Sequence, residues 1–251
     1  MSEQVMLITG ASRGIGAATA RLAAARGFSL AVNYLGRKDA AEAVAADVRK
    51  VGRRAVTIQA DIGKPDDIIR LFQAVDAEFG RLDAFFNNAG ILSRASRFVD
   101  IAPDRLQQLL AVNTTGAFIA AQQAVRRMST RLGGRGGVIV NMSSLAAKLG
   151  GPGESTDYAF CKGAIDTLTI GLAKELASEG IRVNAVRPGL IATDIQNDFG
   201  IGDRVAKYKD LVPMKRGGTP QEVAEAVVWL CSDQASYITG VLLDVSGGRG
   251  L

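Results

Sequence analysis

A short apolar run, a glycine-rich loop and an alanine-rich stretch follow one another at the N-terminus, and this order constrains the fold most strongly. Residues 5–8 read Val-Met-Leu-Ile, which is typical of a strand buried on both faces. The loop after it contains Gly10, Gly14 and Gly16, and residues 17–26 form the predicted helix. Because the first N–H groups of a helix have no intrahelical partner, this arrangement predicts a phosphate-binding site.

Apolar runs and helical patterns alternate along the rest of the chain. Further strands are predicted over 28–33, 55–59, 82–86, 137–141, 181–186 and 240–245, and further helices over 38–50, 65–79, 103–131, about 158–178 and 221–231. Such alternation predicts right-handed crossovers between parallel strands. We therefore expect an α/β fold of the doubly wound, Rossmann type, with a mostly parallel seven-stranded sheet and helices on both faces. A length of 251 residues suits one domain over residues 1–251.

Composition excludes several classes of function. The chain contains no histidine, which excludes a Ser-His-Asp hydrolase, a Cys-His nucleophile and an imidazole-bound metal site, and we expect no metal. The net charge of +5 is spread thinly, so neither nucleic acid nor a membrane surface is an expected partner. Cys161 and Cys231 form no pairing motif, and no leader peptide or membrane span is visible, which together predict a soluble cytoplasmic protein.

Tyr158 and Lys162 carry the most reactive pairing in the sequence. Residues four apart lie on the same face of a helix, so the phenol and the ammonium can meet. A nearby cation favours the phenolate, and we expect it to lower the tyrosine pKa from its usual value near ~10. Ser144 could hold a carbonyl or alcohol oxygen beside that phenol, which predicts a site for proton transfer on oxygen. The alternative for an isolated pair is an interface aromatic and a solvated lysine.

The predicted strand ends assemble these motifs. Ligands of open α/β sheets bind outside the carboxyl ends of the strands, so Gly14, Asn87 and Ser144 are expected to converge on one crevice. An NAD site holds an acidic residue near the end of the second strand, where this chain has Asn33. Arg13 and Arg37 can instead meet a 2′-phosphate, which predicts NADP(H) over NAD(H), unless both arginines are merely solvated.

Together these motifs resemble the short-chain dehydrogenase/reductase family, in its single-domain branch, over essentially the whole chain. The motifs are Thr9-Gly10-x-x-x-Gly14-x-Gly16, Asn87-Asn88-Ala89-Gly90, Asn113, Ser144, Tyr158-x-x-x-Lys162, and Pro188-Gly189 with Thr193. The resemblance implies an oxidoreductase in which Tyr158 is the general acid and Ser144 polarises the carbonyl. Lys162 would bind the nicotinamide ribose and lower the tyrosine pKa, and Asn113 would hold a water in a proton relay.

The expected cofactor site combines the glycine loop with residues that the resemblance implies. It comprises Gly10, Ser12, Arg13, Gly14, Ile15, Gly16, Asn33, Arg37, Asp61, Ile62, Asn88, Ala89, Gly90, Tyr158, Lys162, Pro188, Gly189, Ile191 and Thr193. Asp61 and Ile62 would flank the adenine, and Ile191 and Thr193 would hold the nicotinamide amide. Each also has a structural alternative: Asp61 could cap a helix, Asn113 could stabilise a helix bend, and Thr193 could start a helix.

The substrate is left open between two classes. The chain is similar to the subgroup that contains 3-oxoacyl-carrier-protein reductases and sugar or polyol dehydrogenases, and the three-residue interval between Tyr158 and Lys162 disfavours an enoyl reductase. The candidate substrate wall comprises Ser93, Arg94, Leu145, Leu149, Leu190, Phe199, Leu211 and Met214, and residues 194–218 are the expected lid. The basic residues Arg126, Arg127 and Arg131 could meet an acidic carrier protein or simply stabilise a helix end.

Two further expectations concern assembly and a rival function. The resemblance implies a homotetramer built through the long helix, the helix of Tyr158 and the last strand. The rival is a catalytically idle dinucleotide-binding protein that senses redox state. Retention of both the tyrosine and the lysine favours the enzyme.

Overall fold

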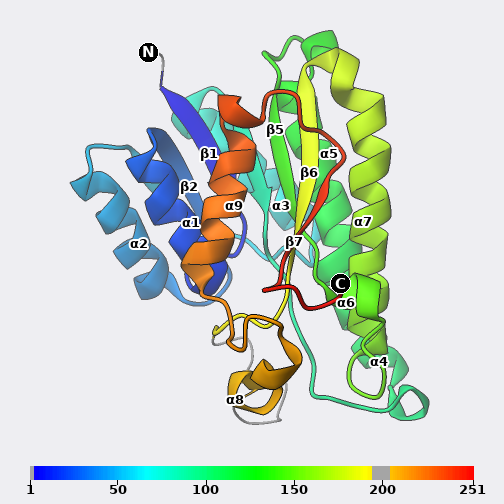
Figure 1. Cartoon of the computed structure of the whole chain (residues 1–251). Helices are drawn as coiled ribbons and strands as arrows, with labels where there is room; N and C mark the ends of the chain where they lie inside the picture. Colours follow the sequence, from blue (N-terminus) through cyan, green and yellow to red (C-terminus); the bar gives the residue numbers. More distant parts are fainter. Residues whose placement is uncertain (1–2, 194–203) are drawn as a thin grey trace.

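The computed structural model describes residues 3–193 and 204–251 and shows a parallel sheet in the order β3-β2-β1-β4-β5-β6-β7 (Figure 1). Its strands are β1 (Gln4–Ile8), β2 (Phe28–Tyr34), β3 (Ala55–Gln59), β4 (Ala84–Asn87), β5 (Gly137–Met142), β6 (Ile181–Pro188) and β7 (Leu242–Val245). The order reverses at β1, which pairs with β2 on one side and with β4 on the other. The predicted doubly wound seven-stranded sheet is confirmed, and it is parallel throughout the described residues.

Two layers of helices cover the sheet. The helices are α1 (Gly14–Ala25), α2 (Lys38–Lys50), α3 (Pro65–Phe79), α4 (Pro103–Leu110), α5 (Ala117–Met128), α6 (Ala146–Leu149), α7 (Thr156–Leu176), α8 (Arg204–Tyr208) and α9 (Pro220–Cys231). One layer consists of α1, α2 and α9, and the other consists of α3, α5 and α7 (Figure 1). None of the described helices is long and apolar enough to cross a membrane.

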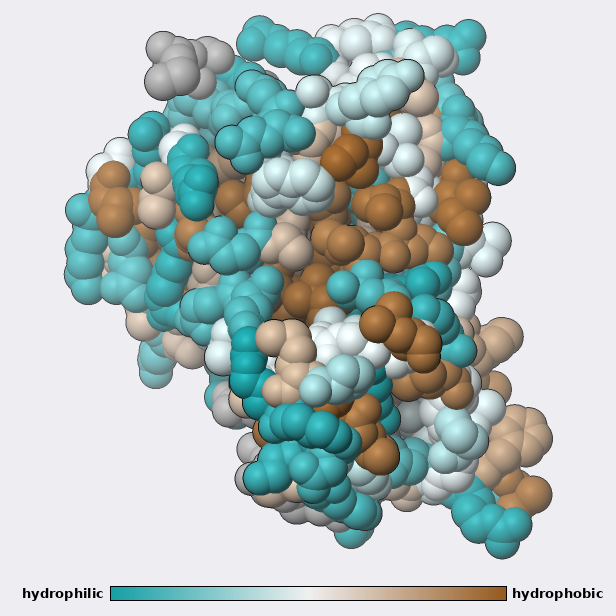
Figure 2. All heavy atoms as spheres, in the orientation of Figure 1, coloured by the Kyte–Doolittle hydropathy of each residue, from teal (hydrophilic) through white to brown (hydrophobic). Residues whose placement is uncertain are grey.

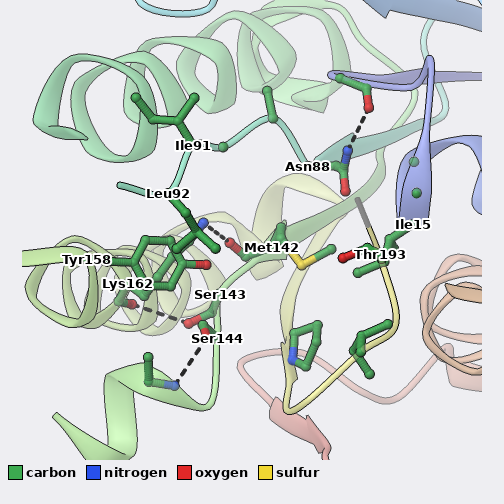
Figure 3. A pocket seen from close by; sticks show the side chains of 18 of the residues that line it. Ile15, Asn88, Ile91, Leu92, Met142, Ser143, Ser144, Tyr158, Lys162 and Thr193 are labelled. Carbon is green, nitrogen blue, oxygen red and sulfur yellow. Dashed lines mark hydrogen bonds between the residues drawn. The ribbon is translucent and has the colours of Figure 1, made fainter. Parts of the chain in front are cut away.

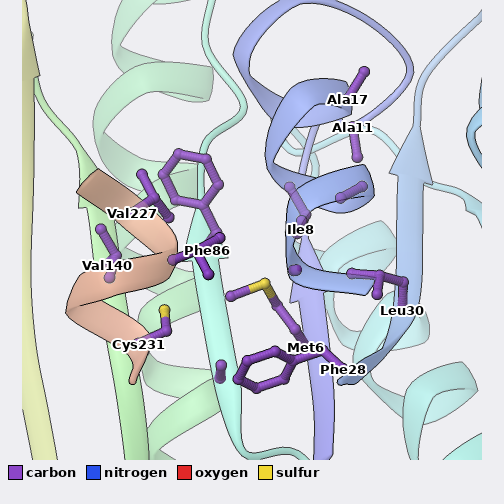
Figure 4. Close-up of a cluster of buried hydrophobic side chains, with 14 of the residues drawn as sticks. Met6, Ile8, Ala11, Ala17, Phe28, Leu30, Phe86, Val140, Val227 and Cys231 are labelled. Atoms are coloured by element: carbon purple, nitrogen blue, oxygen red, sulfur yellow. The ribbon is translucent and has the colours of Figure 1, made fainter. Parts of the chain in front are cut away.

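Strand β1 supplies side chains to both layers, as its continuous apolar run predicts. Met6 and Ile8 pack with residues of α1, α2 and α9, while Leu7 packs toward α3, α5 and α7. Figure 4 shows the first of these clusters, in which Met6 and Ile8 lie among side chains of α1 and α9. A strand that is buried on both faces positions its carboxyl end rigidly, and this end begins the glycine loop.

The helix predicted over 103–131 is interrupted. A π-helical turn over Ala111–Gly116 separates α4 from α5, and α5 ends at Met128. Asn113 lies in this turn, where its amide bonds both the N–H and the carbonyl of Ile91 at 2.9 Å. Gly116 allows the turn to approach the loop after β3, because a Cβ there would lie 2.0 Å from the Ile62 oxygen. These tertiary contacts explain why helical periodicity alone did not show the break.

The carboxyl ends of the strands gather loops from distant parts of the chain. In Figure 1, α4, α6 and α8 lie at this edge of the sheet, and the C-terminus returns to it beside α6. A Cβ at Gly250 would lie 3.1 Å from Leu145, so the tail packs directly against the start of α6. Of the expected lid, residues 194–203 lie outside the described residues, and residues 204–218 contain α8.

Candidate active site

A cavity of about 600 Å³ runs along this edge of the sheet. The side chains predicted to hold a cofactor or to carry the chemistry line it, with the exception of Asn113. The lining residues from that set are Gly10, Ser12, Arg13, Gly14, Ile15, Gly16, Asn33, Arg37, Asp61, Ile62, Asn88, Ala89, Gly90, Ser144, Tyr158, Lys162, Pro188, Gly189, Ile191 and Thr193. The sequence motifs therefore meet in one continuous space.

The glycine loop forms a tight cradle at the start of α1. A Cβ at Gly16 would lie 2.6 Å from the Gly10 oxygen and 2.7 Å from the Asn88 amide nitrogen, so only glycine fits there. That amide donates to the carbonyls of Thr9 at 2.7 Å and Gly10 at 3.2 Å, which fastens the loop to the end of β4. Helix α1 has no side-chain cap and no acidic residue in its first turn. Its N-terminus thus suits an anionic group such as a pyrophosphate.

Asn33 lines the cavity, but its side chain is hydrogen-bonded within the protein. Its Oδ1 accepts from the Gly10 N–H at 3.0 Å, and its Nδ2 donates to the carbonyls of Ile58 at 3.2 Å and Ala60 at 3.1 Å. The buried amide therefore holds the glycine loop against β2 and β3. The exposed Arg37, which precedes α2, lines the same end of the cavity.

Two neighbouring asparagines at the end of β4 have different positions. Asn87 is buried and donates to the Ala117 carbonyl at 2.9 Å and to Asn141 Oδ1 at 3.1 Å. It does not line the cavity, so the prediction that Asn87 reaches the crevice is wrong. The next residue, Asn88, follows the strand, bonds the glycine loop and reaches the cavity instead.

Tyr158 and Lys162 lie together with Ser144 in one corner of the cavity (Figure 3). The Lys162 side chain is 2% exposed, and its Nζ donates to the Met142 carbonyl at 2.7 Å. The same nitrogen lies 5.6 Å from the centre of the Tyr158 ring. The Ser144 side chain lies close enough to the Tyr158 hydroxyl to favour its ionised form, and Ser144 Oγ accepts from the Ala146 N–H at 3.1 Å. The end of β5 thus supplies the serine and the anchoring carbonyl, and α7 supplies the phenol and the amine.

Burial controls the acidity of both groups. It raises the pKa of Tyr158 to about 12, although the neighbouring Ser144 side chain acts in the opposite direction. Burial lowers the pKa of Lys162 to about 8, although the nearby groups of Cys161 and Asp166 act to raise it. The expectation of a lowered tyrosine pKa is wrong for this structure, because the loss of hydration outweighs the lowering of the pKa by Ser144 and Arg204. At neutral pH Tyr158 keeps its proton and is available as a donor.

Asn113 supports this corner from behind the cavity wall. It is fully buried and bonds both backbone groups of Ile91, and a Cβ at Gly90 would lie 2.9 Å from its Oδ1. The same added atom would lie 3.6 Å from Lys162 Nζ. Asn113 therefore fixes the loop after β4 against Lys162.

A charged network behind the corner was not predicted from the sequence. Ser143 Oγ lies 2.6 Å from Asp166 Oδ1 and 3.2 Å from the Lys162 carbonyl. The Arg187 guanidinium donates to the second Asp166 oxygen at 3.0 and 2.8 Å and also lies 3.5 Å from Asp244. The network ties α7 to β5, β6 and β7. Its one sequence signal is the position of Asp166, four residues after Lys162 on the same helix face.

The substrate wall was predicted only in part. Leu145, Leu149 and Leu190 line the cavity, whereas Ser93, Arg94, Leu211 and Met214 do not, and Phe199 lies outside the described residues. Residues missed by sequence reasoning include Ile91, Leu92, Pro152, Glu154, Arg204, Tyr208 and Arg249. They come from loops, a short helix and the chain end, where no periodic pattern indicates which side chains point inward.

Comparisons with known proteins agree with this architecture. A family model described as Enoyl-(Acyl carrier protein) reductase matches residues 10–249. The chain is 47% identical to the uncharacterized oxidoreductase YgfF of Escherichia coli (strain K12), over 98% of this chain and 99% of that protein.

Two solved structures align over nearly their full length. The 3-ketoacyl-(acyl-carrier-protein) reductase of Brucella melitensis, complexed with NADH, is 34% identical, covers 99% of this chain and 98% of its own, and gives a TM-score of 0.91. A short chain dehydrogenase of Burkholderia cenocepacia J2315, in complex with NADP, is 32% identical with the same coverage and a TM-score of 0.91.

Proposed function

The chain belongs to the short-chain dehydrogenase/reductase family, and we propose that it reduces the carbonyl group of a small substrate with NADPH, with Tyr158 as the proton donor. The observation that carries the proposal is that Tyr158, Ser144 and the buried Lys162 line one corner of the cavity, where burial raises the pKa of Tyr158 and keeps its hydroxyl protonated at neutral pH. The reverse reaction, oxidation of a secondary alcohol, uses the same groups. The glycine cradle and the length of the cavity fit a dinucleotide.

The proposed proton transfer follows from the two hydroxyl groups. A carbonyl oxygen that accepts hydrogen bonds from Ser144 and Tyr158 becomes more electrophilic at carbon and lies in line for protonation. Bound NADPH supplies the hydride to that carbon. Tyr158 then gives its proton to the oxygen as negative charge develops there, which completes the alcohol.

Lys162 stabilises the phenolate that Tyr158 becomes when it gives up its proton. When Tyr158 loses its proton, the phenolate that remains is favoured by the ammonium beside its ring. The hydrogen bond to the Met142 carbonyl keeps Lys162 in this position. Asn113 contributes by fixing the adjoining loop, which supports a positioning role for it rather than contact with the reacting atoms.

We infer a preference for NADP(H) over NAD(H) from the end of the cavity beyond β2. Arg13 and Arg37 line it, and Asn33 occupies the place where an acidic residue would repel a 2′-phosphate. A guanidinium matches the geometry of a phosphate and forms charge-assisted hydrogen bonds with it. The solved relatives contain NADH in one case and NADP in the other, so the preference depends on these residues.

We favour an unattached substrate over one held by a carrier protein. Two of the three arginines considered for carrier docking are engaged within the chain: Arg127 bonds both oxygens of Asp76, at 2.8 and 2.6 Å, and Arg131 lies 3.5 Å from Glu179. We favour reduction of C=O over reduction of C=C, because the hydroxyl groups of Tyr158 and Ser144 can both donate hydrogen bonds to a carbonyl oxygen. Oxoacyl thioesters and sugars are therefore compared with small ketones in the assay below.

We also propose a homotetramer. Phe118 of α5 and Phe160 of α7 are 53% and 63% exposed, which is unusual for such side chains. Figure 2 shows hydrophobic residues gathered beside α9 over β7, and β7 is an edge of the sheet. Two separate apolar faces suit two sets of two-fold contacts.

Replacement of Tyr158 by Phe removes the proton donor and keeps the ring. We expect turnover to fall on the order of 10²-fold or more, with NADPH binding retained. The measurement is NADPH consumption against ketones, aldehydes, sugars, acetoacetyl thioesters and crotonyl thioesters. Binding of NADPH without consumption of any of them would indicate the redox sensor. Full activity of a folded Y158F variant would remove Tyr158 from the mechanism.

The rate of carbonyl reduction should depend on the charge of Lys162. We expect turnover to fall as pH rises through about 8, because Lys162 loses its charge there. Tyr158 keeps its proton over the same range, since its pKa is about 12. Asp166→Asn removes a negative charge that raises the lysine pKa, so the fall should move to lower pH.

Asp244→Asn is the matched control for that profile. Asp244 contacts the same Arg187 but is not one of the charges that shift the pKa of Lys162. The variant should keep the midpoint of the parent enzyme, with circular dichroism confirming that both variants fold. A flat rate across roughly pH 7 to 9, or a midpoint that Asp166→Asn leaves in place, would disprove this role of Lys162.

Cofactor preference is tested at Arg37. Arg37→Gln should raise the KM for NADPH on the order of 10-fold and leave the KM for NADH unchanged, since only NADPH carries the 2′-phosphate. Arg53→Gln serves as control, because Arg53 is also exposed but does not line the cavity. An equal effect of Arg37→Gln on both cofactors would contradict the assignment.

The assembly is tested by light scattering of the purified protein. We expect a mass four times the 26.3 kDa of one chain. Phe160→Glu should reduce that mass, because it places a charge in one apolar face. A single-chain mass for the parent protein would exclude the tetramer.

A further inference from the structure

A cluster of charged side chains lines the cavity beyond the catalytic corner, and the proposed reaction leaves it unused. Glu154 from the loop before α7, Arg204 and Tyr208 of α8, and Arg249 of the C-terminal tail line the same cavity as Tyr158. We call Arg204 and Arg249 the arginine subsite. The two arginines come from separate parts of the fold, α8 and the C-terminal tail (Figure 1).

Arg204 is held in a defined position. Its side chain is 14% exposed, and its guanidinium lies 3.2 Å from one oxygen of Glu154. The other Glu154 oxygen accepts a hydrogen bond from the Tyr208 hydroxyl, and the Tyr208 ring centre lies 5.7 Å from the Arg204 guanidinium. Both carboxylate oxygens of Glu154 are therefore engaged, and the Arg204–Glu154 pair is close to neutral in charge.

Arg249 adds a second positive charge to this region. The turn that carries it is closed by two hydrogen bonds with Ser246, at 3.2 and 3.0 Å, and Gly250 packs against Leu145. Within residues 3–193 and 204–251 no carboxylate forms an ion pair with Arg249. Burial lowers the pKa of Arg204, and the positive charge of Arg249 adds to this lowering, which places the two guanidinium groups in each other's field.

The subsite lies close to the reacting groups. The charge of Arg204 acts on Tyr158, where it favours the phenolate and so opposes the rise of the tyrosine pKa that burial causes. The lining of the same cavity also includes the apolar side chains of Leu92, Leu145 and Leu149. A ligand in this part of the cavity thus meets an oxygen-binding corner, apolar side chains and, among the described residues of the subsite and its Glu154 partner, one positive charge in excess.

We propose that the arginine subsite binds a carboxylate of the substrate, so that the protein acts preferentially on oxo acids. The inference rests on the proposed carbonyl reduction and adds its substrate class. A planar carboxylate matches the fork of a guanidinium, and apolar walls with little water screen the attraction weakly. The carboxylate compensates the second positive charge, while the apolar wall holds the carbon chain between acid and ketone.

The test compares oxo acids with their methyl esters. The pairs are 2-oxobutanoate, 3-oxobutanoate, 4-oxopentanoate and 5-oxohexanoate, each with its ester, assayed with NADPH. In 4-oxopentanoate two methylene groups insulate the ketone, so that acid and ester differ mainly in charge. We expect a kcat/KM for at least one acid that exceeds that of its ester by on the order of 10-fold or more.

Variants at Arg249 assign the preference to the subsite. Arg249→Gln should raise the KM for the preferred acid by on the order of 10-fold and leave the ester unchanged, and Arg249→Lys should restore part of the difference. Arg135→Gln, an exposed arginine that does not line the cavity, should leave both substrates unaffected. A merely structural role of Arg249 would instead affect acid and ester equally.

The remaining outcomes separate the subsite from the reaction. Reduction of esters as readily as acids throughout the series would overturn the subsite and leave the reductase intact. If no carbonyl compound is reduced, the proposed function fails. In that case the subsite is tested by binding alone, with calorimetric titration of the oxo acids into the NADPH complex. The parent protein should bind at least one acid, and the Arg249→Gln variant should not bind it. Absence of any such binding would overturn the subsite.

Discussion

The hydrogen bond from the Lys162 ammonium to the Met142 carbonyl is the contact on which the candidate active site depends. It joins the end of β5 to α7 and holds an amine beneath the ring of Tyr158, out of reach of bulk water. Burial of an amine is unfavourable for its charged form, which is why the pKa of Lys162 falls to about 8. The fold thus maintains a group that can still be charged at neutral pH but loses its charge readily.

The surroundings of this contact limit how it can move. Asp166 binds Ser143, the neighbour of Ser144, and shares Arg187 with Asp244 of β7. On the other side, Asn113 uses a π-helical turn to fix the loop that lies against Lys162. Because β7 also forms part of the proposed subunit contact, assembly and catalytic geometry would share one network.

Sequence reasoning succeeded where local pattern determines structure. The apolar run of β1 followed by closely spaced glycines predicted a cradle that only glycine can form, and Gly16 has no space for a Cβ. It failed where tertiary contacts decide. Asn87 and Asn88 are chemically identical, and only their contacts, with Ala117 for Asn87 and with Thr9 for Asn88, determine which one reaches the cavity. The interruption around Asn113 and the inward position of Arg249 likewise depend on contacts with residues distant in sequence. Whether the pKa of Tyr158 rises or falls depends on the burial of its side chain, which the sequence pattern does not reveal.

The most direct test of this account is the protonation of Lys162 itself. Heteronuclear NMR of protein labelled with ¹⁵N at the lysine side chains follows the Nζ signal with pH, and the Lys162→Met variant assigns it by its absence. The account predicts a midpoint of about 8 for Lys162. A midpoint near the ordinary lysine value of 10.5 would show a solvated amine and would contradict the buried arrangement from which the chemistry follows.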